Sequence, residues 1–253
     1  MDDIERFKLF AKHLAEASGT VISSYFRTPV SIDSKADSSP VTIADKKAEE
    51  IMREEIMTEF PDHGILGEEF GEHNSKAEYK WILDPIDGTK SFICGSVTFG
   101  TLIALMKNGE PILGVINQPI LDEFLIGDNL TCEINGIKTN VRNCDTLSDA
   151  VLLTTDHLNI KKYQDINKFD ILTDKVKLYR NWGDCYGYYL VATGYADIMI
   201  DPIMSIWDLM ALIPVIKGAG GTITDYKGGN PVKGNSIIAS APGVHKEVIK
   251  LLN

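Results

Sequence analysis

Two aspartates follow an apolar segment at a point where the chain must change direction. The segment Trp81–Thr89 reads Trp-Ile-Leu-Asp-Pro-Ile-Asp-Gly-Thr, which places Asp84 and Asp87 after a run of apolar side chains. Pro85 has no amide hydrogen and a fixed φ angle, so we expect the strand to end at this proline. The two carboxylates are then expected to converge at the carboxyl end of the strand, where open α/β proteins usually bind ligands.

The residues after Asp87 are suited to hold an anion. Gly88 permits a tight turn, and the amides of Gly88 and Thr89 are placed to begin a helix and to point N–H groups at an anion. The alternative is a simple surface turn with solvated aspartates, since Asp-Pro-x-Asp-Gly is also a common turn sequence.

Three further acids stand at the ends of other expected elements. Glu68 follows a short apolar strand, Asp208 lies in the first turn of an apolar helix that Ser205 is a candidate to cap, and Asp45 follows Thr42 by three positions. Taken singly, each acid has a simple structural explanation. Glu68 could be a solvated strand end, Asp208 a partner of the helix dipole, and Asp45 part of a variant capping box. Taken together, carboxylates at element ends are the ligands that Mg²⁺ prefers.

The elements that must position these residues change in pattern along the chain. Apolar residues recur at helical spacing over 4–26, and a second helix is expected to follow Thr42. Short strands are expected at 64–67 and 80–83, and a hairpin joins two apolar runs across Asn108-Gly109. From about residue 150, strands alternate with helices, among them the helices 159–169, 185–195 and 207–217. We therefore expect an α+β half over 1–145, with most metal ligands, and an α/β half over 146–253, which supplies Asp208 and substrate contacts.

Composition excludes several other classes of protein. The 253 residues are 44% apolar and carry a formal charge of −11, which disfavours nucleic acid and anionic membranes as partners. The acidic amino terminus is not followed by the apolar stretch of a secretory signal, and no apolar run approaches the ~20 residues of a membrane span, so we expect a cytoplasmic protein. The four cysteines form no CxxC pair and the five histidines no HxH or HExxH motif, which argues against zinc.

Four motifs in this order resemble the inositol monophosphatase superfamily of Mg²⁺-dependent, lithium-sensitive phosphatases, over nearly the whole chain. They are Pro40-Val41-Thr42-Ile43-Ala44-Asp45, Gly67-Glu68-Glu69, Trp81 through Thr89 with Phe92, and Trp207-Asp208 ahead of Gly218-Ala219-Gly220-Gly221. The resemblance implies a layered αβαβα sandwich and a phosphomonoesterase that uses a metal-activated water. It also implies a homodimer, Mn²⁺ as a substitute metal and Li⁺ as an inhibitor.

The resemblance also implies a role for each site residue. Glu68, Asp84 and the carbonyl of Ile86 would bind one Mg²⁺, while Asp84, Asp87 and Asp208 would bind a second and Glu68 would help to hold a weaker third. Asp45 and Thr89 would orient the attacking water and help to deprotonate it. The amides of Gly88 and Thr89 would hold the phosphate.

The substrate is indicated by a segment in the second half. Arg180-Asn181-Trp182-Gly183-Asp184-Cys185-Tyr186 resembles a pattern of the histidinol-phosphate phosphatase branch, from which Trp182 departs. Asp184 would pair with a substrate amine, and Asp201 falls where the family often has an acid that contacts the substrate. Arg180 would steer the phosphate or pair with Asp184. The alternatives are an N-cap role for Asp184 and a turn role for Asp201.

Three hypotheses for function follow. The favoured one is a Mg²⁺-dependent phosphatase that acts on L-histidinol phosphate, a small phosphorylated metabolite. The second keeps the chemistry but takes inositol 1-phosphate or a related sugar phosphate. The third is a non-catalytic regulator with the same fold, which the intact set of acids disfavours.

Overall fold

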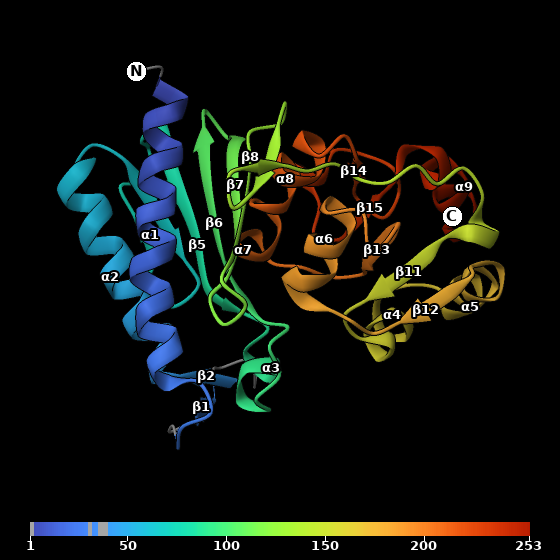
Figure 1. The fold of residues 1–253 in the computed structure, drawn as a ribbon, viewed down its shortest axis with the longest axis horizontal. Helices are drawn as coiled ribbons and strands as arrows, with labels where there is room; N and C mark the ends of the chain where they lie inside the picture. Colours follow the sequence, from blue (N-terminus) through green and yellow to red (C-terminus); the bar gives the residue numbers. More distant parts are fainter. Residues whose placement is uncertain (1–2, 30–31, 35–39) are drawn as a thin grey trace.

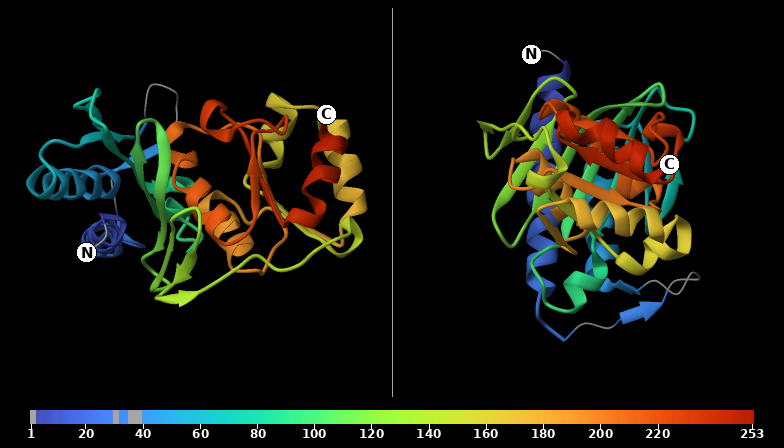
Figure 2. Two further views of the ribbon diagram at one scale, coloured as in Figure 1. Left: turned by 90° about the horizontal axis from the view of Figure 1, so that it is seen from above. Right: turned by 90° about the vertical axis from the view of Figure 1, so that its right-hand side faces the viewer.

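The computed structural model describes residues 3–29, 32–34 and 40–253. Its helices and strands stack as helices, sheet, helices, sheet and helices, and Figure 1 and Figure 2 show these layers from three sides. Separate apolar cores fill the spaces between the layers. The layered αβαβα sandwich implied by the sequence is confirmed.

The first layer consists of two long helices, α1 (Asp3–Tyr25) and α2 (Ile43–Glu59). Helix α1 buries Phe7, Ala11 and Leu14, which recur at helical spacing and pack onto the sheet beneath. The predicted capping box at the start of α2 is confirmed. The side chain of Thr42 accepts from the backbone amide of Asp45, and the side chain of Asp45 accepts from the backbone amide of Thr42.

An eight-stranded sheet forms the second layer, in the order β10-β9-β8-β7-β6-β5-β3-β4. All neighbouring strands are antiparallel except β3 and β5, and the predicted hairpin is β6 with β7. Outside this sheet, β1 (Ile32–Ser34) pairs with β2 (Pro40–Thr42). The strands of the sheet are β3 (Gly64–Gly67), β4 (Gly71–His73), β5 (Tyr79–Asp87), β6 (Gly100–Lys107), β7 (Glu110–Gln118), β8 (Glu123–Gly127), β9 (Cys132–Ile134) and β10 (Ile137–Lys138).

The middle layer holds α6 (Asp184–Ala192), α7 (Ile206–Leu209) and α8 (Leu212–Gly218), which lie on the other face of this sheet. The prediction of one continuous helix over 207–217 was wrong, because the segment forms α7 and α8 with a break between them. Pro214 in the first turn of α8 has no amide hydrogen, and its ring would clash with the carbonyl of Met210 in a continuous helix.

The last two layers are a five-stranded sheet, in the order β12-β11-β13-β15-β14, and the helices that cover it. The helix predicted over 159–169 is in fact α4 and α5, because Asp165 caps a new helix by accepting from the amide of Asn167 at 3.0 Å. The elements are β11 (Val151–Thr154), β12 (Leu178–Arg180), β13 (Ile198–Asp201), β14 (Thr222–Thr224), β15 (Ile237–Ser240), α4 (His157–Tyr163), α5 (Ile166–Lys175) and α9 (Pro242–Leu252), with short 3-10 turns at Leu147–Asp149 and Pro231–Lys233.

Candidate metal and phosphate site

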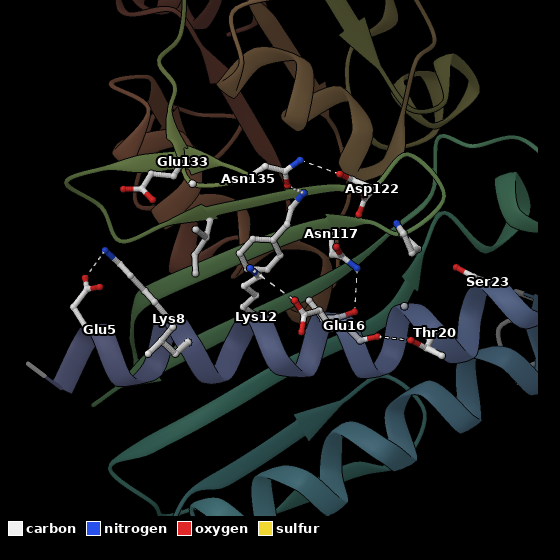
Figure 3. Close-up of a pocket in the computed structure, with 17 residues that line it drawn as sticks. Glu5, Lys8, Lys12, Glu16, Thr20, Ser23, Asn117, Asp122, Glu133 and Asn135 are labelled. Carbon is white, nitrogen blue, oxygen red and sulfur yellow. Dashed lines mark hydrogen bonds and ion pairs between the residues drawn. The ribbon is translucent and has the colours of Figure 1, made fainter. Parts of the chain in front are cut away.

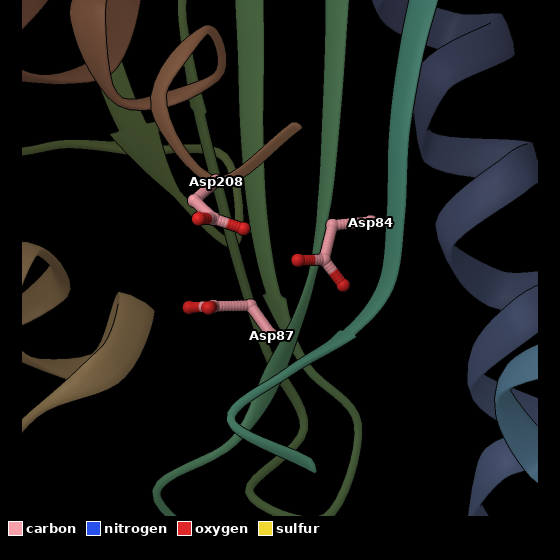
Figure 4. Close-up of side chains that lie close together, drawn as sticks. All are labelled: Asp84, Asp87 and Asp208. Carbon is pink, nitrogen blue, oxygen red and sulfur yellow. The ribbon is translucent and has the colours of Figure 1, made fainter. Parts of the chain in front are cut away.

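Three carboxylates from distant parts of the sequence meet at one point. Asp84 and Asp87 belong to β5, and Asp208 belongs to α7. Each offers an oxygen that lies within 4.8 Å of the others, and Figure 4 shows the side chains turned toward a common space. The predicted convergence of Asp84 and Asp87 is therefore observed.

The local backbone differs from the prediction that the strand ends at Pro85. Strand β5 continues to Asp87, which pairs with Gly100 after an irregularity between Asp84 and Asp87. The proline is accommodated at this bulge, which is one of the few places where a sheet accepts a residue without an amide hydrogen. Thr101 fixes the bulge by donating its hydroxyl to the carbonyl of Pro85 at 2.9 Å.

The bulge also explains how both acids reach one site. In a regular strand, residues three positions apart point to opposite faces of the sheet. An irregularity that changes the count between the two positions turns the second side chain toward the face of the first. The amide of Cys185, in the first turn of α6, then donates to the Asp87 carboxylate and links it to the middle helical layer.

Electrostatics makes this cluster unfavourable without a cation. Asp84 is 2% exposed, and its Oδ1 atom has no hydrogen-bond partner among the described residues. Burial raises the pKa of Asp84 well above its usual value, and the charges of Glu68, Asp87 and Asp208 raise it further. Burial likewise raises the pKa of Asp87, together with Asp184 and Asp208. An orphaned buried oxygen within a set of carboxylates fits a hard divalent cation.

Asp208 lies in the first turn of α7, as predicted, and it has a capping role that was not predicted. The amide of Ser205 donates to its Oδ2 atom at 2.7 Å, so Asp208 completes the capping box of α7. The same carboxyl group faces the acids of β5, and burial raises its pKa to about 6. The capping bond fixes the orientation of the carboxylate toward the other two acids.

Glu68 lies beside this cluster, in the loop that joins β3 to β4. Its amide donates to the carbonyl of Leu83 at 3.2 Å, which ties the loop to β5. Its charge raises the pKa of Asp45, Asp84 and Asp208, so the carboxylate lies near all of them. Glu68 is therefore near the cluster, but it is not one of the three described acids whose oxygens lie within 4.8 Å of one another.

Asp45 and Thr89 approach each other at the edge of the cluster. Thr42 donates its amide (2.8 Å) and its hydroxyl (2.6 Å) to Oδ2 of Asp45, which leaves Oδ1 facing the hydroxyl of Thr89 at 3.4 Å. Thr89 also contacts the carbonyl of Ile86 at 3.1 Å. Burial raises the pKa of Asp45. The hydroxyl of Thr89 thus lies within hydrogen-bond reach of both the Asp45 carboxylate and the Ile86 carbonyl.

Helix α3 (Thr89–Ile93) begins at Gly88, whose φ of 88° favours glycine. A Cβ atom at Gly88 would lie 2.7 Å from Oδ2 of Asp184, so the absence of a side chain also allows α6 to approach. Asp184 accepts a hydrogen bond from the hydroxyl of Ser91 at 2.9 Å, which joins α3 to α6. Burial raises the pKa of Asp184, against the effects of this hydrogen bond and of the Lys90 charge.

The predicted substrate contacts are not all brought together. The N-cap of α6 is Gly183, so Asp184 is its first residue rather than its cap, with a φ of 52°. Asp201 is buried and accepts from the Thr155 amide at 3.2 Å and the Tyr188 hydroxyl at 2.8 Å. Burial raises the pKa of Asp201 to about 7. Arg180 is exposed and donates to the carbonyl of Tyr179 at 2.6 Å, and no described ion pair joins it to Asp184.

A cavity of 760 Å³ lies elsewhere, between α1 and strands β7 to β9 (Figure 3). Trp81 and Leu83 of β5 pack toward α1 and α2, whereas Ile82 packs toward the middle helices. Asp84 shares the face of Ile82, so the acids and this cavity lie on opposite faces of the sheet. The cavity is lined by Lys8 and Glu5, which are paired with each other at 3.0 Å.

Fold and site together define a layered α/β protein with a buried carboxylate cluster that is suited to a divalent cation. The chain matches the model of the inositol monophosphatase family over residues 3–253, and it belongs to that family. The family is generally metal-dependent, in agreement with the acidic cluster. In the part of the chain that is described, no helix is long and apolar enough to cross a membrane.

Similar proteins are named as phosphatases. The Arabidopsis thaliana protein named "Bifunctional phosphatase IMPL2, chloroplastic" is 48% identical over 230 residues, which are 89% of this chain and 66% of that protein. A histidinol-phosphatase from Chlorobaculum parvum is 42% identical over 220 residues, 86% of this chain and 85% of its own length. The solved structure of an inositol monophosphatase from Zymomonas mobilis covers 100% of this chain and 99% of its own, with a TM-score of 0.89 and 36% identity.

Other relatives carry the names inositol-1-monophosphatase and fructose-1,6-bisphosphatase/inositol-1-monophosphatase. Family membership thus makes the chain a phosphoric monoester hydrolase, and it leaves the substrate open.

Proposed function

We propose that this protein hydrolyses a small phosphate monoester with Mg²⁺ as its metal and a water as its nucleophile. The observation that carries the proposal is the meeting of Asp84, Asp87 and Asp208, with a buried Asp84 oxygen that has no partner in the described chain. Acids at this density are costly in a fold unless cations neutralise them. The attack of a water is preferred to that of an aspartate, because the spacing is Asp-x-x-Asp rather than Asp-x-Asp.

The ligands fall into overlapping sets. Glu68, Asp84 and the carbonyl of Ile86 would hold one Mg²⁺, and Asp84, Asp87 and Asp208 would hold a second, with Glu68 also helping to hold a weaker third. Bound Mg²⁺ supplies positive charge that lowers the pKa of water and stabilises the developing charge on the ester. Mn²⁺ substitutes for Mg²⁺, and Li⁺ inhibits.

The proton of the attacking water leaves through Thr89 and Asp45. The Thr89 hydroxyl lies between the site and Oδ1 of Asp45, and the raised pKa of Asp45 makes this carboxylate a better proton acceptor than a solvated one. Thr42 holds the opposite oxygen of Asp45 and so fixes the direction in which the proton moves.

The amides of Gly88 and Thr89 hold the phosphate, and the acids nearby select the alcohol part of the phosphate ester. Asp184 is favoured as the partner of a substrate amine, because its carboxylate lies beside Gly88 and belongs to a largely buried wall. Asp201 serves as a second acid that contacts the substrate, and Arg180 steers the phosphate from the surface.

L-histidinol phosphate is the favoured substrate, since it carries a phosphate, a primary amine and an imidazole. Similarity to proteins named histidinol-phosphatase supports this choice. Inositol 1-phosphate or a related sugar phosphate remains the alternative, because relatives with those names have the same fold. A non-catalytic regulator is disfavoured by the intact acids.

We also infer the setting of this activity. Residues 1–145 hold most ligands, whereas residues 146–253 supply Asp208 and the substrate contacts. The protein works in the cytoplasm as a homodimer.

The test compares kcat/KM for histidinol phosphate and inositol 1-phosphate, with Asp87→Asn as the inactive reference. In the wild type we expect the amine substrate to be preferred by at least about tenfold. Asp184→Ala should remove most of this preference, because one charged hydrogen bond contributes about 1.5–3 kcal/mol. Equal values for the two esters, lowered alike by Asp184→Ala, would exclude amine recognition. Release of no phosphate from either ester would favour the regulator.

A further inference from the structure

A buried ion pair lies under the loop that carries Glu68. Glu49, in the middle of α2, is 0% exposed, and its carboxylate receives Nε of Arg53 at 2.7 Å. The same carboxylate accepts the amide of Glu69 at 2.7 Å and the amide of Phe70 at 3.1 Å. These are the residues that directly follow Glu68, so the carboxylate bonds the backbone of the loop that carries this acid.

The pair holds both ends of the same loop. A Cβ atom at Gly67 would lie 1.9 Å from Oε1 of Glu49, so the backbone before Glu68 rests directly on the carboxylate. Arg53 also donates its Nη2 atom to the carbonyl of Gly71, where β4 begins. The segment Gly67–Gly71 is thus in close contact with the pair at its start and is hydrogen-bonded to it at its middle amides and at its end.

The bonds from Glu49 and Arg53 to this loop also oppose an electrostatic repulsion between Glu68 and the other acids. The amide of Glu68 donates to the carbonyl of Leu83, which directly precedes Asp84 in β5, so the loop brings one more carboxylate toward the acids, and like charges repel it whenever no cation is bound. A fully buried carboxylate is expensive unless it is paired and hydrogen-bonded, and Glu49 is both. Its bonds therefore act against the repulsion and keep Glu68 ready for the cation.

We propose that Glu49 and Arg53 are positioning residues that hold the Glu68 loop for metal binding. The inference rests on the proposed function only in taking Glu68 as a metal ligand. Neither residue supplies a ligand atom, and both act through the backbone of Gly67–Gly71.

The test measures Mg²⁺ binding to the metal-free protein by calorimetry, for the wild type, Arg53→Met and Glu49→Gln. Both variants should bind Mg²⁺ about tenfold more weakly, the lower end of the effects seen when residues that support ligands are removed. Hydrogen exchange supplies a second measurement, in which the amides of Glu69 and Phe70 should exchange faster in the variants than in the wild type. Glu49→Gln keeps an acceptor oxygen, so it serves if Arg53→Met does not fold.

A matched control is available in an ion pair that links residues 142 and 197. Arg142 forms an ion pair with Asp197, which is 0% exposed and also accepts the amide of Val151 at 2.6 Å. Arg142→Met therefore breaks a pair of the same kind far from the acids, and we expect it to lower Tm without changing Mg²⁺ affinity.

Loss of Mg²⁺ affinity in Arg53→Met but not in Arg142→Met supports the positioning role. Equal Mg²⁺ affinity in the wild type, Arg53→Met and Glu49→Gln would overturn it, even if both variants melt at lower temperature. A wild type that releases no phosphate, but whose variants bind Mg²⁺ more weakly, would instead remove the proposed function and keep this inference.

Discussion

At the scale of single residues, the acids of this site work against the fold until a cation arrives. Asp84 and Asp87 are buried next to Asp208, and their pKa values are raised because the protein interior and the neighbouring charges both disfavour ionisation. A group whose pKa is raised by folding lowers the stability of the folded state at pH values above its normal pKa. Part of the stability of the rest of the fold is therefore used to keep this cluster together.

Asp208→Asn tests that cost directly. In EDTA at pH 7.5 we expect a higher Tm than in the wild type, because a pKa raised from 3.8 to about 6 corresponds to a penalty on the order of 3 kcal/mol. The asparagine oxygen can still accept from the Ser205 amide, so the start of α7 is preserved. Scanning calorimetry with and without Mg²⁺ measures both effects. A variant that melts below the wild type in EDTA, or that gains as much from Mg²⁺, contradicts this account.

How far these residues could be predicted depends on what brings them together. Asp84 and Asp87 are close in sequence, and the proline and glycine around them indicated a special turn, although the bulge that aligns them was not predicted. Glu49 and Arg53 stand four positions apart on α2, which is typical of an exposed helical pair. Only the packing of the β3–β4 loop onto α2 shows that Glu49 is buried.

At the scale of elements, two glycines set how closely the middle helices approach the sheet. A Cβ atom at Gly114 of β7 would lie 2.0 Å from the carbonyl oxygen of Ala211, and one at Gly127 of β8 would lie 2.5 Å from Cα of Val215. The backbone of α8 therefore lies directly on these strands. Because α7 ends only a few residues before α8 begins, this contact also helps to set the distance between Asp208 and β5.

Gly127→Ala should consequently destabilise the protein by about 1–3 kcal/mol, since the backbone of Pro214 and Val215 must move to admit a methyl group. The measurement is the free energy of unfolding in urea. Gly19→Ala, in α1, is the comparison, because its Cβ atom would lie 3.2 Å from Cβ of Pro119 and 3.3 Å from Nδ2 of Asn117, which are side-chain atoms, and a helix gains from alanine, so the loss should be smaller. A Gly127→Ala variant as stable as the wild type would show that α8 can shift freely.

The elements themselves were largely predictable, with exceptions that have physical causes. Helical spacing predicted α1, and Asn108-Gly109 predicted the hairpin of β6 and β7. The breaks between α4 and α5 and between α7 and α8 could have been predicted, since Asp165 and Pro214 interrupt apolar patterns that otherwise look continuous. The bulge was not readable, because it depends on Thr101 and Gly100 of the neighbouring strand.

At the scale of the whole molecule, one apolar core joins the two sheets. Ile82 and Ile116 of the eight-stranded sheet pack in the same cluster as Tyr188 of α6 and Met199 of the five-stranded sheet. The acids of β5 and α7 meet at the edge of this shared core. Binding a cation there ties together parts of the chain that are distant in sequence.

Mg²⁺ should therefore stabilise the molecule as one unit. At about 100 times its Kd, a ligand contributes about 2.7 kcal/mol, which corresponds to a rise in Tm of roughly 5–10 °C for a chain of this size. We expect a single transition both in Mg²⁺ and in EDTA, recorded by calorimetry and by near-ultraviolet circular dichroism. Two transitions, of which only one responds to Mg²⁺, would show that the halves unfold separately.

The division of the acids between β5 and α7 also has a consequence during synthesis on the ribosome. Asp208 follows Asp87 by 121 positions, so a ribosome that adds about 5–20 residues per second needs roughly 6–24 s to reach it. During that interval the nascent chain already carries the acids of β5, but it lacks both α7 and the core that α7 completes. A cation that needs all three acids would therefore bind only late in biosynthesis, and a chain truncated before Asp208 would keep the repulsion between Asp84 and Asp87 without the complete site.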